Sequence, residues 1–240
     1  MMKSPFRGRV KVFADGADLK SMLEMAKNPV VKGFTTNPTL MKKAGLTDYE
    51  KFSREVLETI PNHPISFEVF ADDFKEMHRQ ALKIAAWGKN VYVKIPVTNS
   101  KGESAAPLMK DLSKAGVKLN ITALFTINQV LTVCDSVRGG APSVISVFAG
   151  RIADSGRDPI PMMQACLEIC KSTGPECELL WASSRELLNI VQADMIGCPI
   201  ITCTPDLIAK LSSVDKDLDQ FSLETVKMFK DDAEKAGFRL

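Results

Sequence analysis

The sequence is poor in histidine and lacks the close cysteine pairs that many structural metal sites use. It has six cysteines and two histidines, and no two cysteines form a CxxC pair. Neither His63 nor His78 lies at a ligand spacing from a cysteine, so the pattern gives little support to a zinc site. Cys166 and Cys170 lie four residues apart on one face of an expected helix. We therefore expect buried, reduced thiols and no bound metal.

Long apolar runs, charge of one sign and nucleotide-binding glycine motifs are also missing. No stretch approaches the roughly 18 consecutive apolar residues of a membrane span, and the opening MMKSPFRGR lacks the apolar core of a signal peptide. The formal net charge of +2 is too small to indicate nucleic acid binding. The dinucleotide pattern GxGxxG and the P-loop pattern are both absent. We expect a soluble, cytoplasmic protein with neither nucleic acid nor membrane as a partner.

What is present is an alternation of short apolar segments with longer amphipathic ones. We expect strands at 10–14, 31–35, 65–70, 91–95, 117–121, 143–148, 178–182 and 199–203. Helices are expected at 18–27, 48–60, 72–87, 103–115, 126–137, 159–171, 184–193, 205–211 and 222–236. Strands that alternate with helices predict a parallel sheet. Eight such units in 240 residues favour an α/β fold with a single (β/α)₈ TIM barrel over the alternative, an open doubly wound sheet.

The expected barrel is one domain over residues 1–240, in which 1–9 form a short N-terminal extension and about 222–240 a C-terminal helix and tail. Short polar residues indicate where helices begin, and we expect N-caps at Asp18, Asp48, Asp72 and Thr126. Glycines indicate where helices end, and we expect this role for Gly88, Gly116 and Gly197.

Polar side chains follow nearly every expected strand. In a (β/α)₈ barrel the carboxyl ends of the strands meet at one rim, where active residues lie. These ends carry Asp15, Thr36, Asn37, Glu68, Lys94, Asn120, Thr122, Ser146, Arg151, Ser183 and Arg185. Strand ends are wetter than strand centres, which accounts for Ser, Asn and Thr there. This access to water accounts less well for Lys94 and Glu68, which lie within apolar strands.

Lys94 stands in VYVKIPV, a strand expected to be buried on both faces. Burial disfavours the charged form of an amine, and a neutral amine is a nucleophile towards carbonyl groups. The alternative is a lysine at the rim that forms a salt bridge with Glu68 or Asp15. The strand context leaves both interpretations open. The two carboxylates would transfer protons in the first case and neutralise the lysine in the second.

Arg151 and Arg185 follow two consecutive strands, so their loops are neighbours in a barrel. Two guanidinium groups beside Ser183 suit a phosphate monoester, because each planar fork offers paired charge-assisted hydrogen bonds. Taken singly, each is equally well explained as a surface arginine.

The motifs together resemble the transaldolase family, and in particular its short group that includes the fructose-6-phosphate aldolases. The resemblance covers about residues 10 to 236. It rests on FADGAD (13–18), GFTTNPT (33–39), VYVKIPVT (91–98), LNITALFT (119–126), SVFAGRIAD (146–154) and WASSR (181–185). It implies a class I aldolase type of barrel that acts on sugar phosphates, needs no cofactor and forms a homo-oligomer, a pentamer or decamer.

The resemblance also implies a role for each matching residue. Lys94 matches the Schiff-base lysine, Asp15 the acid/base at the C4 hydroxyl, and Glu68 with Thr122 the pair that holds a catalytic water. The substrate-binding residues would be Thr36, Asn37, Asn120, Ser146, Phe148, Arg151, Ser183 and Arg185. Among these, Asn37, Asn120 and Ser146 would hold the dihydroxyacetone unit. Arg151, Ser183 and Arg185 would bind phosphate, and Thr36 would support the Asn37 loop.

Two positions separate activities within the family. Fructose-6-phosphate aldolases carry glutamine and tyrosine where this chain has Glu68 and Phe148. The resemblance therefore implies a transaldolase, with a lyase that releases free dihydroxyacetone as the alternative. A barrel that binds sugar phosphate without catalysis is a remote third possibility. Departures at Gly16, Trp181 and Ser184 leave the acceptor sugar open.

Overall fold

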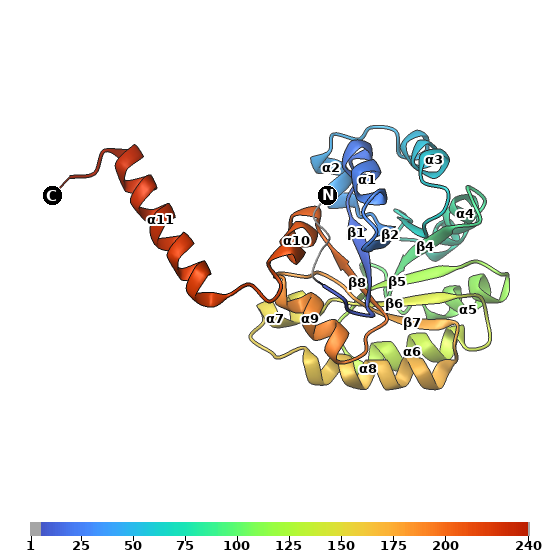
Figure 1. The fold of residues 1–240 in the computed structure, drawn as a ribbon. Helices are drawn as coiled ribbons and strands as arrows, with labels where there is room; N and C mark the ends of the chain where they lie inside the picture. The colour runs from blue at the N-terminus through green and yellow to red at the C-terminus, as the bar shows by residue number, and fades with distance from the viewer. Residues whose placement is uncertain (1–5, 240) are drawn as a thin grey trace. The chain divides into compact units, whose positions relative to one another are not determined.

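The computed structural model describes residues 6–239 (Figure 1). Within this range eight parallel strands form a closed barrel in chain order. The strands are β1 (Lys11–Asp15), β2 (Val31–Thr35), β3 (Ile65–Glu68), β4 (Val91–Pro96), β5 (Leu119–Leu124), β6 (Ser143–Val147), β7 (Cys177–Trp181) and β8 (Ile200–Cys203). The expected (β/α)₈ barrel is confirmed, and the open-sheet alternative is wrong because β1 pairs with β8.

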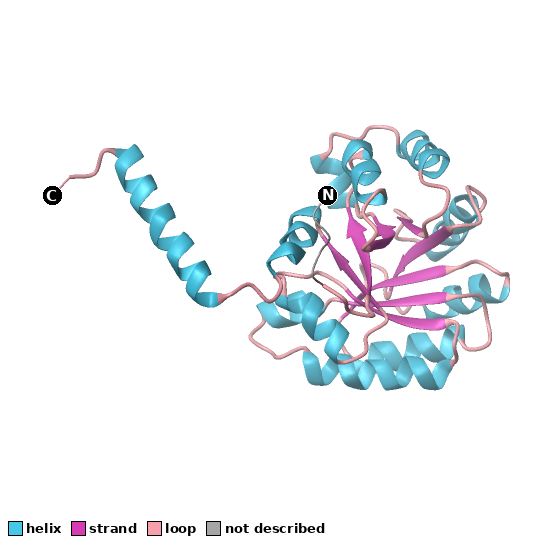
Figure 2. Cartoon of the chain, viewed as in Figure 1, coloured by secondary structure: helices cyan, strands magenta, loops and turns pink. Residues whose placement is uncertain are grey.

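Helices surround the barrel on the outside, as Figure 2 shows by colour. Those between β1 and β8 are α1 (Leu19–Ala26), α2 (Pro38–Lys43), α3 (Tyr49–Thr59), α4 (Phe74–Ala85), α5 (Ala106–Lys114), α6 (Ile127–Val137), α7 (Ala149–Asp154), α8 (Ile160–Thr173) and α9 (Leu188–Met195). Strand residues are buried on both faces, inward against the barrel interior and outward against the helices. Two-sided burial explains why the strands read as apolar runs.

Contacts divide the described residues into two compact units, Gly8–Ile208 and a second unit that comprises residues 6–7 and 209–239. The first unit holds the barrel and most of α10 (Pro205–Ala209). The second contains the 3₁₀ helix η1 (Lys210–Ser213) and α11 (Leu218–Ala236), which ends at Gly237 in the left-handed conformation. The single domain expected over 1–240 stays a prediction, and the extension expected over 1–9 falls partly outside the described residues.

Two short helices, α2 and α7, have no counterpart among the expected elements. Each has six residues, too few to display a helical period in the sequence. The caps at Asp18, Asp48 and Thr126 are confirmed, the last with a full capping box.

Other boundary predictions fail. The expected cap at Asp72 is wrong, because Asp73 caps α4 and Asp72 instead accepts hydrogen bonds from Ser100. Gly116 and Gly197 end their helices with positive φ values, whereas Gly88 does not. Gly88 lies two residues beyond Ala86, the C-cap of α4. Gly88 therefore does not have the helix-ending role that we expected for it.

The register of the strands brings the chemically active side chains to one level. Glu68 on β3 is paired with Lys94 on β4, which is paired in turn with Asn120 on β5. Residues in register on adjacent parallel strands point to the same side of the sheet. Glu68, Lys94 and Asn120 are far apart in the sequence but lie side by side in the barrel. Over residues 6–239, none of the helices combines the length and apolar character needed to cross a bilayer.

Candidate active site

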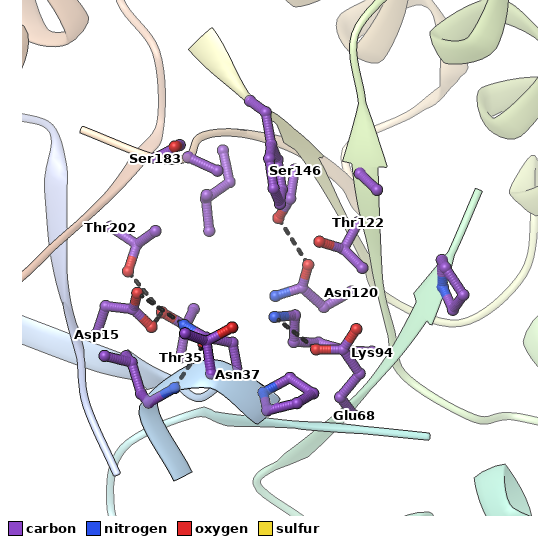
Figure 3. Close-up of a pocket in the computed structure, with 18 of the residues that line it drawn as sticks. Asp15, Thr35, Asn37, Glu68, Lys94, Asn120, Thr122, Ser146, Ser183 and Thr202 are labelled. Carbon is purple, nitrogen blue, oxygen red and sulfur yellow. Dashed lines mark hydrogen bonds and ion pairs between the residues drawn. The ribbon is translucent and has the colours of Figure 1, made fainter. Parts of the chain in front are cut away.

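A cavity of about 430 Å³ lies at the carboxyl ends of the strands (Figure 3). It is the place where a barrel of this type presents its active residues. Most of the residues singled out from the sequence line it: Asp15, Asn37, Glu68, Lys94, Asn120, Thr122, Ser146, Phe148, Arg151 and Ser183. Two others, Thr36 and Arg185, are not among the lining residues.

Lys94 is the only lysine among the residues that line this cavity, and its side chain is almost fully buried. Its Nζ donates a hydrogen bond of 2.8 Å to the carbonyl of Thr36 and lies 3.2 Å from Oε2 of Glu68. Thr36 is fully buried, and its hydroxyl is tied to the carbonyl of Ser66. The Thr36 carbonyl thus fixes the position of the Lys94 amine. The ion pair with Glu68 is present, as the salt-bridge alternative expects. The nucleophilic role of Lys94 stays a prediction, and the amine lies on the cavity wall where that role requires it.

The backbone of Glu68 is held by a residue that the sequence did not single out. The Tyr49 hydroxyl accepts a 2.8 Å hydrogen bond from the Glu68 N–H and donates one of 3.1 Å to the Glu68 carbonyl. The pairing of β2 with β3 ends at Ser66, so Tyr49 replaces a strand partner at this point. The sequence signals that α3 begins near Tyr49, but nothing in it indicates contact with β3.

Asp15 lies across the cavity from Lys94 (Figure 3). Thr35 Oγ1 donates to one carboxylate oxygen at 2.8 Å, and Asn37 Nδ2 donates to the other at 3.2 Å. Burial raises the pKa of Asp15 above its usual value, although the charge of Lys94 and the hydrogen bond from Thr35 act in the opposite direction. A carboxyl group with a raised pKa holds and releases protons closer to neutrality, as a general acid/base must. Thr202 Oγ1, 2.6 Å from that of Thr35, extends this network.

Asn120 and Ser146 form a second polar wall. Ser146 Oγ donates to Asn120 Oδ1 at 2.6 Å, and Asn120 Nδ2 donates to Ser66 Oγ at 2.9 Å. All three side chains are buried. Their hydrogen bonds fix the Asn120 amide and direct it towards the space above Lys94 (Figure 3). Ser66 is another residue that the strand-end pattern missed, because it lies in the middle of β3.

The two arginines expected at one phosphate site are placed differently. Arg151 lines the cavity, with its guanidinium 5.4 Å from the centre of the Phe148 ring. Arg185 instead forms a two-pronged ion pair with Asp154, with nitrogen–oxygen distances of 2.5 and 3.0 Å. Arg185 follows β7 as expected, but the helix predicted from residue 184 begins only at Leu188. The charged partner of Arg185 comes from α7, which the sequence did not indicate.

Close backbone packing sets the position of Arg151. A Cβ atom at Gly150 would lie 1.6 Å from the carbonyl oxygen of Ser183, so only glycine fits there. Ser183 itself has a φ of 65°, which is rare for a residue with a side chain. These two features bring the start of α7 against the end of β7 and place Arg151 and Ser183 on the same part of the cavity wall.

Fold and site together define a (β/α)₈ barrel whose cavity is built around a buried lysine between two carboxylates. The family model described as transaldolase/fructose-6-phosphate aldolase matches residues 12–240. The chain belongs to this transaldolase and fructose-6-phosphate aldolase family.

Relatives named probable transaldolase cover most of the chain. One from Dehalococcoides mccartyi is 36% identical over 193 residues, which cover 80% of this chain and 86% of the relative. Another, from a Thermoanaerobacter species, is 32% identical over 231 residues, covering 96% of this chain and all of the relative. A crystal structure of dihydrodipicolinate synthase from Rhodopseudomonas palustris shares the fold, with a TM-score of 0.57 and 13% identity over 93% of this chain and 79% of that one.

Proposed function

We propose that the protein is a transaldolase that transfers a dihydroxyacetone unit from a ketose phosphate, such as fructose 6-phosphate, to an aldose phosphate. The observation that carries this proposal is the placement of Lys94. Its amine is buried, faces the cavity and lies 3.2 Å from Glu68, with the Asp15 carboxyl group on the opposite wall. This arrangement suits a covalent imine mechanism, which needs a nucleophilic amine and separate groups that move protons.

In the first half of the reaction the Lys94 nitrogen attacks the C2 carbonyl of the ketose. The resulting carbinolamine loses water, and Glu68 supplies the proton through a water molecule held with Thr122. Asp15 then takes the proton of the C4 hydroxyl. The C3–C4 bond breaks, its electron pair flows into the protonated imine, and an aldose phosphate leaves.

In the second half the three-carbon enamine on Lys94 attacks the aldehyde of an acceptor. Asp15 returns its proton to the new hydroxyl, and water then hydrolyses the imine to release the product ketose. Asn37, Asn120 and Ser146 hold the hydroxyls of the three-carbon unit throughout. The imine is itself the electron sink, so these steps need no metal or organic cofactor.

The phosphate of each substrate binds at Arg151 and Ser183, which share one part of the cavity wall. Arg151 is oriented by its contact with the Phe148 ring. Arg185 joins this group only when it exchanges the Asp154 carboxylate for the phosphate, because Asp154 engages the same donors. A phosphate offers the same planar match to a guanidinium as a carboxylate does.

Reduction of the imine with borohydride tests the mechanism. Treatment in the presence of fructose 6-phosphate should add a reduced three-carbon fragment to the peptide that contains Lys94, as read by mass spectrometry. Lys94→Met should abolish the addition. Lys110→Met is the matched control, because Lys110 is an exposed residue on α5. Labelling that persists in Lys94→Met removes the mechanism. Failure of every ketose to give a trapped adduct would favour a barrel that only binds sugar phosphates.

The family also contains lyases, and Phe148 helps to distinguish a transferase from a lyase. Phe148 packs against Phe125 and Arg151 and offers no hydroxyl to the cavity. The enamine therefore has no tyrosine hydroxyl at position 148 to assist its protonation and release, and it persists until an acceptor aldehyde arrives.

Incubation with fructose 6-phosphate alone separates the two activities. A transferase should release about one aldose phosphate per active site and then stall with the three-carbon unit still bound, so that little free dihydroxyacetone appears. Phe148→Tyr should release dihydroxyacetone continuously. Rapid multiple turnover by the wild type without an acceptor would establish the lyase instead.

We further propose that the enzyme works in the cytoplasm as a homo-oligomer, a pentamer or decamer, as its family resemblance implies. The second unit supports this proposal. In α11, apolar residues recur among charged ones, at Phe221, Val226 and Phe229. Sedimentation at micromolar concentration tests it. A monomer under those conditions would remove the proposal without affecting the proposed activity.

A further inference from the structure

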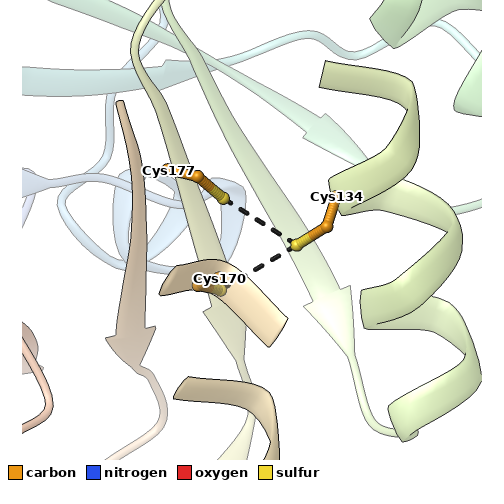
Figure 4. A group of neighbouring side chains, drawn as sticks. All are labelled: Cys134, Cys170 and Cys177. Carbon is orange, nitrogen blue, oxygen red and sulfur yellow. Dashed lines mark hydrogen bonds between the residues drawn. The ribbon is translucent and has the colours of Figure 1, made fainter. Parts of the chain in front are cut away.

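Three cysteines that lie far apart in the sequence meet beside the barrel (Figure 4). Cys134 is on α6, Cys170 on α8, and Cys177 is the first residue of β7. Their sulfur atoms all lie within 4.8 Å of one another, and all three residues are buried and unlinked. The cluster is separate from the active cavity, because Cys177 is at the opposite end of β7 from Ser183.

The sulfur spacing matches a tetrahedral metal centre. Cys134 Sγ lies 3.9 Å from Cys170 Sγ and 3.8 Å from Cys177 Sγ. Zinc–thiolate bonds of about 2.3 Å at tetrahedral angles hold two sulfur atoms about 3.8 Å apart. A zinc ion would therefore need only a small adjustment of the third sulfur–sulfur distance.

The charge of the surroundings suits a divalent ion. Arg138 donates hydrogen bonds to the carbonyls of Ser172 and Thr173 and so brings a positive charge to this region, partly offset by Asp135 at 4.0 Å. Three thiolates with one divalent cation carry one net negative charge, opposite in sign to the nearby Arg138 guanidinium. Buried charge needs such compensation.

A route to the cluster and a fourth ligand are also present. A cavity of about 170 Å³ is lined by Cys177 and Thr173, and its rim includes the exposed Gly139, Pro175 and Glu176. The cavity has room for a water molecule. The buried Thr173 hydroxyl, which donates its proton to the Ile169 carbonyl, also lines this cavity. Either oxygen can occupy the fourth position of a zinc ion, which is usually four-coordinate in proteins.

We propose that Cys134, Cys170 and Cys177 bind one zinc ion, with water or Thr173 as the fourth ligand. Binding forms three zinc–sulfur bonds and releases the thiol protons to solvent. The ion joins α6, α8 and β7 and so stabilises that side of the barrel. Because the cluster is remote from Lys94, the proposal holds or fails independently of the transaldolase activity.

Metal content is the first measurement. Protein produced with added zinc and purified under a phosphine reductant should hold about one zinc per chain by mass spectrometry of the metal. The variants Cys134→Ser, Cys170→Ser and Cys177→Ser should each lose most of it. Cys166→Ser is the matched control, because Cys166 is fully buried on the same helix as Cys170 but outside the cluster. It should retain the zinc of the wild type.

A second measurement uses the wild-type protein alone, since a serine in the core can also unfold the chain. Cobalt added to the zinc-free protein should produce the thiolate-to-cobalt absorption of a tetrahedral sulfur site, and zinc should displace it. A chelator that removes the zinc should lower the midpoint of thermal unfolding, and added zinc should restore it.

Three results would overturn the proposal. These are wild-type protein without stoichiometric zinc or a cobalt–thiolate band, an equal loss of zinc in Cys166→Ser, and a disulfide between Cys134 and a cluster partner in protein supplied with zinc under reducing conditions.

Discussion

Replacing Tyr49 with phenylalanine removes one oxygen atom, the partner of both backbone groups of Glu68. The rest of the side chain is unaffected, because a phenylalanine ring retains the edge-on contacts with Phe67, Phe70 and Trp87. Tyr49→Phe therefore isolates the hydroxyl. The N–H and C=O of Glu68 face the β2 side, where strand pairing has already ended.

The size of the effect follows from the two groups left without a partner. A buried polar group that loses its hydrogen bond costs about 1–3 kcal/mol, and partial access to solvent places this site towards the lower end of that range for the pair together. In a domain of this size each kcal/mol lowers the midpoint of thermal unfolding by about 2–4 °C. We expect a loss of about 1–2 kcal/mol in the free energy of unfolding and a fall of a few degrees in the midpoint of thermal unfolding.

Catalysis should suffer through Glu68. Its carboxylate lies 3.2 Å from the Lys94 amine, and displacement of a catalytic group by as little as about 1 Å can cost up to roughly a hundredfold in rate. We expect kcat to fall about tenfold while KM changes little, because Tyr49 does not line the cavity.

The assays are urea and thermal unfolding together with steady-state kinetics. Tyr92→Phe is the control, since the Tyr92 hydroxyl makes no hydrogen bond within residues 6–239. A Tyr49→Phe protein as stable and active as Tyr92→Phe would refute the reasoning.

Two other substitutions test the site from different directions. Burial raises the pKa of Asp15, so the stability that Asp15 contributes is present below its usual pKa and is lost as the pH rises through its folded-state value. Asp15→Asn should therefore melt higher than the wild type near neutral pH and should lose this advantage at about pH 4; a lower melting temperature at neutral pH would contradict the assignment. Gly150→Ala places a methyl group 1.6 Å from the Ser183 carbonyl oxygen and should destabilise the fold by about 1–3 kcal/mol. It should also raise KM for a phosphorylated acceptor more than for its unphosphorylated analogue, and an equal rise for both would separate Gly150 from phosphate binding.

Local patterns in the sequence were sufficient for the architecture. Apolar strands buried on both faces alternate with amphipathic helices, and this alternation gives the eight parallel strands of the barrel. The polar residues at strand ends were also readable, because a barrel brings all of these ends to one rim whatever their distance along the chain. Lys94, Glu68 and Asp15 could be placed at one cavity on this ground alone. Their proposed roles came from the family resemblance.

The choice of partners was decided only by the tertiary structure. Tyr49 holds Glu68 from a neighbouring helix, and Ser66 holds Asn120 from the middle of a strand. Arg185 faces Asp154 because α7, too short to leave a periodic signal, turns that carboxylate towards it.

The cysteines illustrate the same limit. The spacing of Cys166 and Cys170 indicates only a shared helix face, and in the structure Cys170 forms a cluster with Cys134 and Cys177. Periodicity reports which side of an element is buried, and so it determined the barrel and its rim. It carries no information on which side chain from another element fills the space opposite, because that depends on the angles and offsets at which the elements pack.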